Sequence, residues 1–232
     1  MMQKETLGQH ISQQFNTEIE ELRSRFLGMG GLVEKQVNEA ITALVEGDSG
    51  LAQLVREADK HTNQMEATID EECVRILARR QPAASDLRLI ISISKAVISL
   101  ERIGDESKKI AKRAIALSEE GAEATHGYVE VRHIGDQVRR MVQEALDAFA
   151  RFDSQQAREV VAYDKNVDRE YKTALRELVT YMMEDPRSIS RVLNVVWVLR
   201  SLERIGDHAR NIARLVIYLV EGERNPGPSS EL

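Results

Sequence analysis

The sequence is poor in cysteine, proline and aromatic residues. Its one cysteine, Cys73, has no partner for a disulfide bond within the chain, which favours a reducing compartment, so we expect a cytoplasmic protein. Only 4 prolines occur among the 232 residues, and aromatic residues make up 4% of the chain. Because large β-sheets favour aromatic and β-branched residues, this composition favours helices.

The sequence also lacks a basic domain and a long apolar run. With a net charge of −6 and no basic domain, the chain does not have the electrostatic footprint of a dedicated nucleic-acid-binding protein. The two most apolar windows, 89–100 and 192–199, are too short or too interrupted by charge to span a bilayer. The polar N-terminal stretch has no apolar core of the kind found in signal peptides. We therefore expect a protein that neither binds nucleic acid nor crosses a membrane.

What the sequence does contain is an internal repeat. The heptapeptide SLERIGD occurs at 99–105 and again at 201–207. Upstream of it, the dipeptide Asp-Lys at 59–60 recurs at 164–165. Because the same segments recur in the same order, the chain is predicted to contain two copies of one structural unit.

Each copy is predicted to hold three long helices. Apolar residues recur at spacings of three and four from 90 to 115 and from 192 to 216, which is the period of an amphipathic helix. Gly47, Pro82 and Pro186 are typical of the breaks between helices. These signals predict helices near residues 9–46, 50–80, 85–119, 127–151, 154–184 and 187–221.

Three long helices joined by short loops pack as an up-and-down bundle. We therefore predict an all-α protein of two tandem three-helix bundles. The first repeat is expected at 1–121 and the second at 127–221, with the joint between the bundles at residues 121–127. The remaining tail, 222–232, is expected to be disordered.

The repeated heptapeptide places two acidic residues on one helical face. Glu101 and Asp105 lie four residues apart in the first repeat, as do Glu203 and Asp207 in the second. Like charges at this spacing repel, at a cost of about 0.2–0.5 kcal/mol. Both pairs lie beside the predicted apolar seam. A helix selected for stability alone would carry a lysine at one of these positions.

A glycine lies between the two acids of each pair. Gly104 and Gly206 each cost their helix about 1 kcal/mol relative to alanine. We expect a neighbouring helix to approach closely at both glycines and so to offset that cost. Such an approach would also bring side chains of the neighbouring helix close to the acids.

The middle helix of each repeat is predicted to supply those side chains. In the second repeat it carries Asp164 and Asp168, and in the first it carries Asp59 and Asn63 at the matching positions. Crowded carboxylates favour the binding of a cation. Oxygen ligands are typical of hard ions such as Mg²⁺, Mn²⁺, Ca²⁺ or iron, and not of a zinc site built from thiolates. The competing interpretation is a solvated acidic surface with lysine and arginine neighbours.

The sequence resembles the PhoU family of bacterial phosphate-transport regulators. The resemblance rests on the twin E-R-I-G-D motifs, the tandem three-helix repeats and the run RRQPAASDLRLIISISK at 79–95, and it covers nearly the whole chain. It implies an all-α, cytoplasmic negative regulator of the phosphate regulon and of phosphate uptake that is not an enzyme. It also implies an adaptor between the phosphate ABC transporter ATPase and the sensor histidine kinase. We expect a homodimer that reaches the membrane only through these partners.

The resemblance also implies metal binding, since some PhoU-like proteins carry iron or zinc clusters on E(D)-x-x-x-D motifs. The ion expected here is iron, zinc, manganese or magnesium. Because Asn63 contributes no charge, we expect the first-repeat site to bind a cation more weakly than the second. The implied ligands are Glu101, Asp105, Asp59, Asn63, Glu203, Asp207, Asp164 and Asp168.

Two other functions stay open at the level of the sequence. One is an oxygen-ligated metalloenzyme, such as a phosphatase-like hydrolase with a two-metal site. The sequence places no evident nucleophile or general base beside the acids, which counts against this reading. The other is a purely structural dimerisation module, which predicts neither metal binding nor a phosphate-dependent phenotype.

Overall fold

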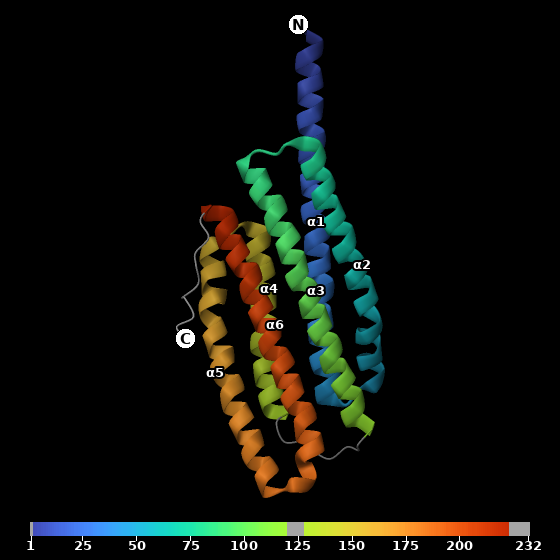
Figure 1. Ribbon diagram of the computed structural model, residues 1–232, viewed down its shortest axis with the longest axis vertical. Helices are drawn as coiled ribbons and strands as arrows, with labels where there is room; N and C mark the ends of the chain where they lie inside the picture. Colours follow the sequence, from blue (N-terminus) through green and yellow to red (C-terminus); the bar gives the residue numbers. More distant parts are fainter. Residues whose placement is uncertain (1, 120–127, 223–232) are drawn as a thin grey trace.

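The computed structural model of the chain is built from long α-helices (Figure 1), and it describes residues 2–119 and 128–222, with side chains from residue 13 onward. No strand occurs within these ranges, so the predicted all-α class is confirmed. The helix bounds agree with prediction to within about two residues, except that the first helix begins at Met2. The elements are α1 (Met2–Glu46), α2 (Ser49–Arg80), α3 (Ala84–Glu119), α4 (Tyr128–Arg151), α5 (Ser154–Glu184), the 3₁₀ turn η1 (Pro186–Ser188) and α6 (Ile189–Glu221).

The helices form two three-helix bundles that lie side by side (Figure 1). Helices α1, α2 and α3 contact one another, and so do α4, α5 and α6. The bundles meet where α3 packs on α6 and α1 packs on α4, which leaves α2 and α5 on the outer flanks. The predicted joint at 121–127 and the tail from 223 lie outside the described residues.

The two copies of the heptapeptide lie in the paired helices at the centre of the molecule. Helices α3 and α6 run in opposite directions, as the colour sequence in Figure 1 shows. The heptapeptide is near the middle of each helix, because it covers 99–105 of α3 and 201–207 of α6. The two motifs are therefore brought close to the interface between the bundles.

Local sequence signals account for the starts of the middle helices. Asp48 precedes α2, and its Oδ1 accepts a hydrogen bond from the backbone N–H of Leu51 at 2.9 Å. Asp153 caps α5 in the same way, with Gln156 as the donor at 2.9 Å. These side chains satisfy N–H groups that have no partner within the helix. At the break that Pro186 marks, Asp185 accepts a hydrogen bond from the backbone N–H of Arg187 at 3.3 Å and starts a 3₁₀ turn ahead of α6.

The apolar faces of the helices meet in a core that continues across both bundles. Phe26 of α1 and Phe149 of α4 are fully buried and their ring centroids lie 4.5 Å apart, so aromatic packing links the two bundles.

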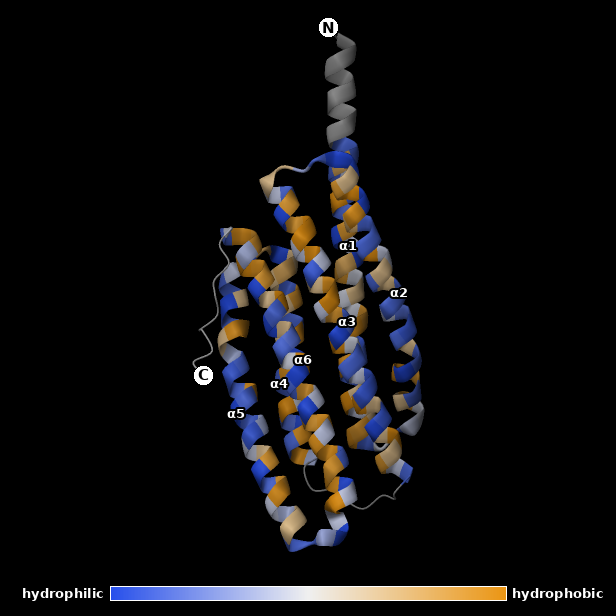
Figure 2. Cartoon of the chain, viewed as in Figure 1, coloured by the Kyte–Doolittle hydropathy of each residue, from blue (hydrophilic) through white to orange (hydrophobic). Residues whose placement is uncertain are grey.

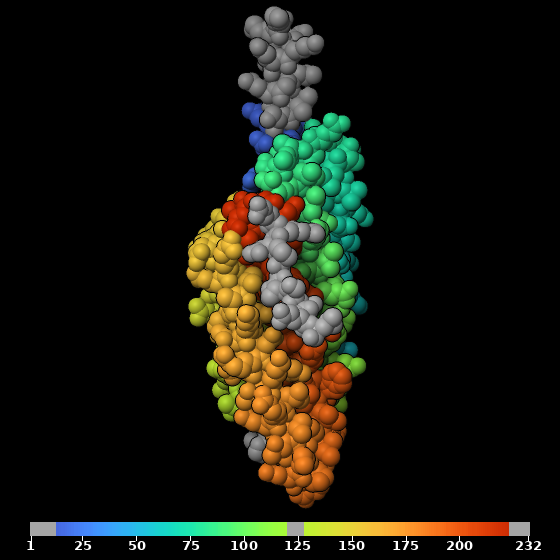
Figure 3. All heavy atoms as spheres, turned by 60° about the vertical axis from the view of Figure 1, so that its left-hand side comes forward, coloured from blue at the N-terminus to red at the C-terminus, as the bar shows by residue number. Residues whose placement is uncertain are grey.

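Hydrophilic residues are most frequent on the outer helices α2 and α5 (Figure 2), as expected for helices with one solvated face. Turned to bring α5 forward, the molecule is an elongated body (Figure 3). Among the described helices, none combines the length and apolarity that a bilayer span requires.

Candidate cation-binding patches

The first acidic patch lies between α2 and α3. Asp59 of α2 is 2% exposed, and the ammonium group of Lys108 on α3 donates a hydrogen bond to its Oδ2 at 2.6 Å. The other carboxylate oxygen of Asp59, Oδ1, is buried without a hydrogen-bond partner among the described residues. Asn63 lies one turn further along α2 and its side chain is exposed. The structure therefore places the buried acid, and not the amide, against α3.

Glu101 and Asp105 of α3 complete the first patch together with a residue that the sequence analysis missed. Burial raises the pKa of Glu101, and the carboxylates of Asp105 and Glu66 raise it further. Burial likewise raises the pKa of Glu66, with a smaller contribution from Asp105. Glu66 follows Asn63 by three residues on α2, so a search one helical turn beyond Asn63 would have found this acid.

The second acidic patch lies between α5 and α6 and contains an arginine. Asp164 of α5 is 4% exposed, and the guanidinium of Arg210 on α6 donates a hydrogen bond to its Oδ2. The same guanidinium forms an ion pair with Oδ1 of Asp207 at 2.6 Å. Burial raises the pKa of Asp164, although the hydrogen bond from Arg210 opposes that shift. Arg210 thus bridges two of the predicted ligands.

Glu203 and Asp168 lie at the edge of the second patch. Burial raises the pKa of Glu203, and Asp207, Asp168 and Asp164 add to the shift. Arg200 donates a hydrogen bond to Oε1 of Glu203 at 2.9 Å, whereas Oε2 is buried without a partner among the described residues. All four predicted residues of the second repeat are therefore close enough to interact electrostatically.

The arrangement has the donor chemistry of a hard-cation site but already contains a cation. Within the described ranges, no three or more acidic, histidine or cysteine side chains are grouped so as to hold a metal ion. Lys108 and Arg210 occupy matching positions, three residues beyond the heptapeptide in each repeat. Lys108 forms an ion pair with the buried Asp59, and Arg210 forms one with the buried Asp164. In both patches the position beside the buried acid is thus held by a basic side chain.

The two heptapeptide glycines differ in their surroundings. A Cβ atom on Gly104 would lie 3.2 Å from Oε1 of Gln36 and 3.3 Å from a methyl carbon of Thr62, so α1 and α2 approach this glycine closely. A Cβ atom on Gly206 would lie no nearer than 3.7 Å to Met141 or Val167, which is ordinary packing. The expected close approach is confirmed at Gly104, and it is wrong at Gly206 because that site has room for a methyl group.

A second polar cluster joins the two bundles beside the heptapeptides. Glu106 of α3 is 2% exposed and accepts a hydrogen bond from Lys109 at 3.0 Å. Its Oε1 also forms an ion pair with Nε of Arg204 on α6 at 3.1 Å. His208 lies nearby, and burial together with Arg204 lowers its pKa. These contacts give Arg204 a structural role across the interface.

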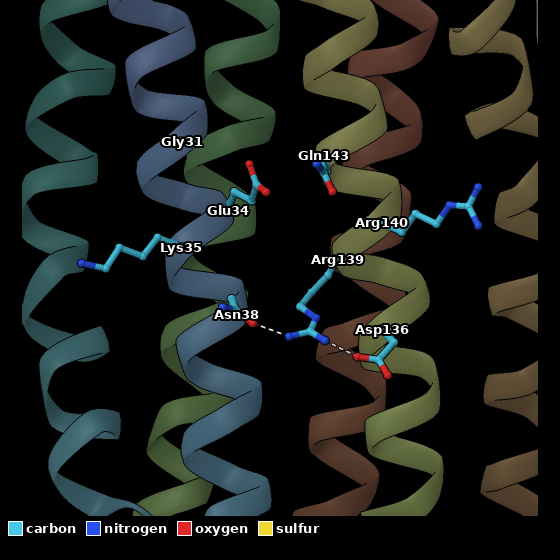
Figure 4. Close-up of a pocket in the computed structure, with 8 residues that line it drawn as sticks. All are labelled: Gly31, Glu34, Lys35, Asn38, Asp136, Arg139, Arg140 and Gln143. Atoms are coloured by element: carbon cyan, nitrogen blue, oxygen red, sulfur yellow. Dashed lines mark hydrogen bonds and ion pairs between the residues drawn. The ribbon is translucent and has the colours of Figure 1, made fainter.

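A groove of about 740 Å³ between α1 and α4 lies apart from both acidic patches (Figure 4). Its lining includes Lys35, Asn38, Asp136, Arg139 and Arg140, and none of the eight predicted ligands. Figure 4 shows Arg139 reaching between Asn38 and Asp136, while Lys35 and Arg140 point away from the groove. The basic groups at this groove are therefore engaged or turned outward.

Comparison with known proteins gives close matches over both bundles. The family model described as the PhoU domain matches residues 26–114 and 131–216. A Pseudomonas putida protein, the phosphate-specific transport system accessory protein PhoU homolog, is 77% identical over 96% of this chain and 86% of its own length. The Escherichia coli K12 protein called phosphate-specific transport system accessory protein PhoU is 46% identical over 94% of this chain and 89% of its own.

Solved structures agree with the sequence matches. The crystal structure of PhoU from Pseudomonas aeruginosa aligns with a TM-score of 0.88 at 76% identity, covering 90% of this chain and 100% of that one. The phosphate transport system regulatory protein PhoU from Streptococcus pneumoniae aligns with a TM-score of 0.82 at 32% identity, covering 90% of this chain and 98% of that one. On these matches in sequence and structure, the chain belongs to the PhoU family.

Proposed function

We propose that this chain is a regulatory accessory protein of a phosphate-specific transport system. The observation that carries the proposal is its 77% identity, over 96% of its length, to a protein of that name. Its match to a regulatory protein of a phosphate transport system at a TM-score of 0.82 supports the same role at lower identity. The chain acts in this role as a binding protein and not as an enzyme.

The finer part of the proposal concerns direction and partners. The chain is a cytoplasmic, homodimeric negative regulator of the phosphate regulon and of phosphate uptake. It links the phosphate ABC transporter ATPase to the sensor histidine kinase and reaches the membrane through them. The long hydrophilic flanks formed by α2 and α5 support this role, because they offer extended surfaces for protein contacts.

Deletion and reconstitution test the regulatory role. Cells that lack the gene are expected to express a phosphate-starvation reporter in phosphate-rich medium, and the intact gene is expected to restore repression. Purified chain is then mixed with the ATPase and with the cytoplasmic region of the kinase, and direct binding to both is expected. An unchanged reporter in the deletion strain would exclude the negative regulator. Turnover of a generic phosphate ester with added Mn²⁺ or Fe²⁺ would favour the hydrolase instead.

We further propose that the two acidic patches accept iron, zinc, manganese or magnesium. The electrostatic influence of Asp105 and Glu66 on Glu101, and of Asp207 and Asp168 on Glu203, supports this step. Burial and mutual repulsion raise the pKa of Glu66, Glu101 and Glu203. A bound ion would neutralise the patch and supply open coordination positions for phosphate groups or for acids of a partner. For an ion to bind there, Lys108 and Arg210 would have to leave Asp59 and Asp164, with which they form ion pairs.

A further inference from the structure

We infer that the outward face of the paired helices α3 and α6 docks directly on an anionic membrane surface. The inference goes beyond the proposed function, in which the chain reaches the membrane through its protein partners. It gives a role to an exposed apolar stripe that precedes the heptapeptide on α6, and to the basic side chains that continue this stripe.

One line along α6 carries three large apolar side chains in contact with solvent. Ile189, Leu193 and Trp197 follow one another at intervals of four residues, and they are 41%, 43% and 56% exposed. Residues at this spacing share one face of a helix. In the first repeat, the position that matches Trp197 holds Lys95. The repeated architecture therefore does not itself require an aromatic side chain at this place.

The same line of α6 continues into basic residues. Arg200 and Arg204 follow Trp197 by three and seven residues, a spacing that keeps them on the face of the apolar stripe. From the neighbouring helix α3, the guanidinium carbon of Arg113 lies 5.9 Å from the centroid of the Trp197 ring. The apolar stripe thus borders a basic area built by both helices, and we call the two together the α3/α6 face.

The ion pairs of the α3/α6 face direct their positive ends outward. The side chain of Glu106 is 3% exposed, whereas those of its two partners, Lys109 of α3 and Arg204 of α6, are 52% and 44% exposed. Arg200 is 49% exposed beside Glu203, which is 14% exposed. In each pair the acid lies beneath and the cation lies on the surface. Because two cations share Glu106, this cluster also carries a surplus positive charge.

This face is positive although the chain as a whole has a net charge of −6. Arg102 of α3 is 54% exposed beside Glu101, which is 15% exposed. Arg113 donates to the amide oxygen of Asn194 at 3.1 Å, a neutral partner that leaves its charge uncompensated. Charge complementarity therefore favours an anionic occupant. A second copy of the chain is disfavoured, because a symmetric dimer would place this basic face against itself.

An anionic lipid surface fits both parts of the α3/α6 face. Tryptophan favours the headgroup level of a bilayer, and aliphatic side chains such as Leu193 favour the layer just beneath it. Lysine and arginine side chains are attracted to the anionic headgroups of the cytoplasmic leaflet. Helices α3 and α6 lie side by side (Figure 1), so both can lie along the surface with their basic groups among the headgroups.

Vesicle binding by the full-length protein tests the inference. Vesicles of phosphatidylcholine alone are compared with vesicles that also contain phosphatidylglycerol, and co-sedimentation gives the partition coefficient. The chain has 1 tryptophan, so a blue shift of the emission reports that the α3/α6 face itself enters the lipid. The variants are Leu193→Ser and the double variant Arg102→Gln/Arg200→Gln.

Matched controls remove the same kinds of side chain from other surfaces. Leu54→Ser removes a leucine that is 61% exposed on α2. Arg140→Gln removes an arginine that pairs with Glu144 on the solvated side of α4. Circular dichroism melting curves verify that each variant folds as the wild type does.

We expect the wild type to sediment with the phosphatidylglycerol vesicles, and not with phosphatidylcholine alone, and its tryptophan emission to shift to the blue. The double variant is expected to lower the partition coefficient about 25-fold, since each basic residue at an anionic surface contributes about fivefold. Leu193→Ser should reduce both the binding and the shift, and added salt should weaken the binding. Both controls should match the wild type.

Several outcomes overturn the inference. If the wild type does not sediment with phosphatidylglycerol vesicles, or if the variants bind as tightly as the controls, the α3/α6 face does not dock on lipid. If Leu193→Ser instead dissociates a dimer in analytical ultracentrifugation, the occupant is a second copy. A tryptophan shift with the ATPase or the kinase, and none with vesicles, identifies a partner protein. The proposed regulatory role is unaffected by these results, because the reporter assay tests it separately.

Discussion

At the scale of single residues, an ion pair between Arg80 and Glu18 joins helices α1 and α2 of the first bundle. Arg80, at the end of α2, donates from Nε to Oε2 of Glu18 at 3.0 Å and from Nη2 to Oε1 at 2.7 Å. This two-point geometry connects α1 to α2 near the turn into α3. The Arg80 guanidinium holds the pKa of Glu18 below its usual value.

This pair predicts a pH-dependent stability. Because the pKa of Glu18 is lower in the folded state, the stabilisation is complete above the unfolded pKa of about 4.3 and is lost as the pH falls through the folded pKa. Glu18→Gln is expected to lower the free energy of unfolding by about 0.5–1 kcal/mol at neutral pH. Urea unfolding at a series of pH values measures the difference, which should shrink below pH ~4. A difference that stays constant into acid would contradict the prediction.

At the scale of helices, glycines set the distance between α1 and α4. A Cβ atom on Gly30 of α1 would lie 2.6 Å from a terminal methyl carbon of Leu146 on α4, and one on Gly135 of α4 would lie 3.1 Å from Ile41 on α1. The helices therefore interlock at two small residues, one on each side. The neighbouring Gly31 differs, because a Cβ atom there would meet nothing within 4 Å.

A matched pair of alanine variants follows from this contact. Gly30→Ala has to displace Leu146, and overpacking of this kind costs about 1–3 kcal/mol, which outweighs the gain in helix propensity. Gly31→Ala meets open space and should stabilise the protein by about 1 kcal/mol. Guanidinium unfolding of both variants gives the comparison. If both variants raised the free energy of unfolding by the same amount, α1 and α4 would not pack closely at Gly30.

At the scale of the whole molecule, the two bundles are joined through one extensive contact between helices α3 and α6. Helix α3 packs against α6 as broadly as it does against α2. Leu100 and Ile103 of α3 and Leu202 and Ile205 of α6 are fully buried in the apolar core that continues across both bundles. Without the other bundle, the face of α3 or of α6 that packs between the bundles would be exposed to solvent.

We therefore expect the full chain to unfold in one cooperative transition. The chain has 1 tryptophan, Trp197, which lies on α6 with the guanidinium carbon of Arg113 of α3 5.9 Å from its ring centroid, so its fluorescence reports on α6 and on its contact with the first bundle. Far-UV circular dichroism reports on the helices of both bundles. The two unfolding curves in urea should coincide, as two-state behaviour requires. A fluorescence transition displaced from the circular dichroism transition would show that the bundles unfold separately.

The sequence by itself determined the helices, their breaks and the duplication. The three-and-four apolar spacing, the glycine and proline breaks and the repeated heptapeptide act within a few turns of chain, so these features were readable before any packing was known. The same periodicity placed Glu101 with Asp105, and Glu203 with Asp207, on single helical faces. It also identified the middle helix as the source of Asp59 and Asp164.

Only the tertiary structure decided what neutralises those acids. Arg210 reaches Asp164 across 46 positions of sequence, and Lys108 reaches Asp59 across 49. These choices depend on the packing of one helix against another and on side-chain rotamers, which no local pattern encodes. The same holds for Glu66, which joins the first patch, and for Gly206, which proved to have room around it. Helical periodicity is local, whereas an ion pair between helices exists only once the bundle has formed.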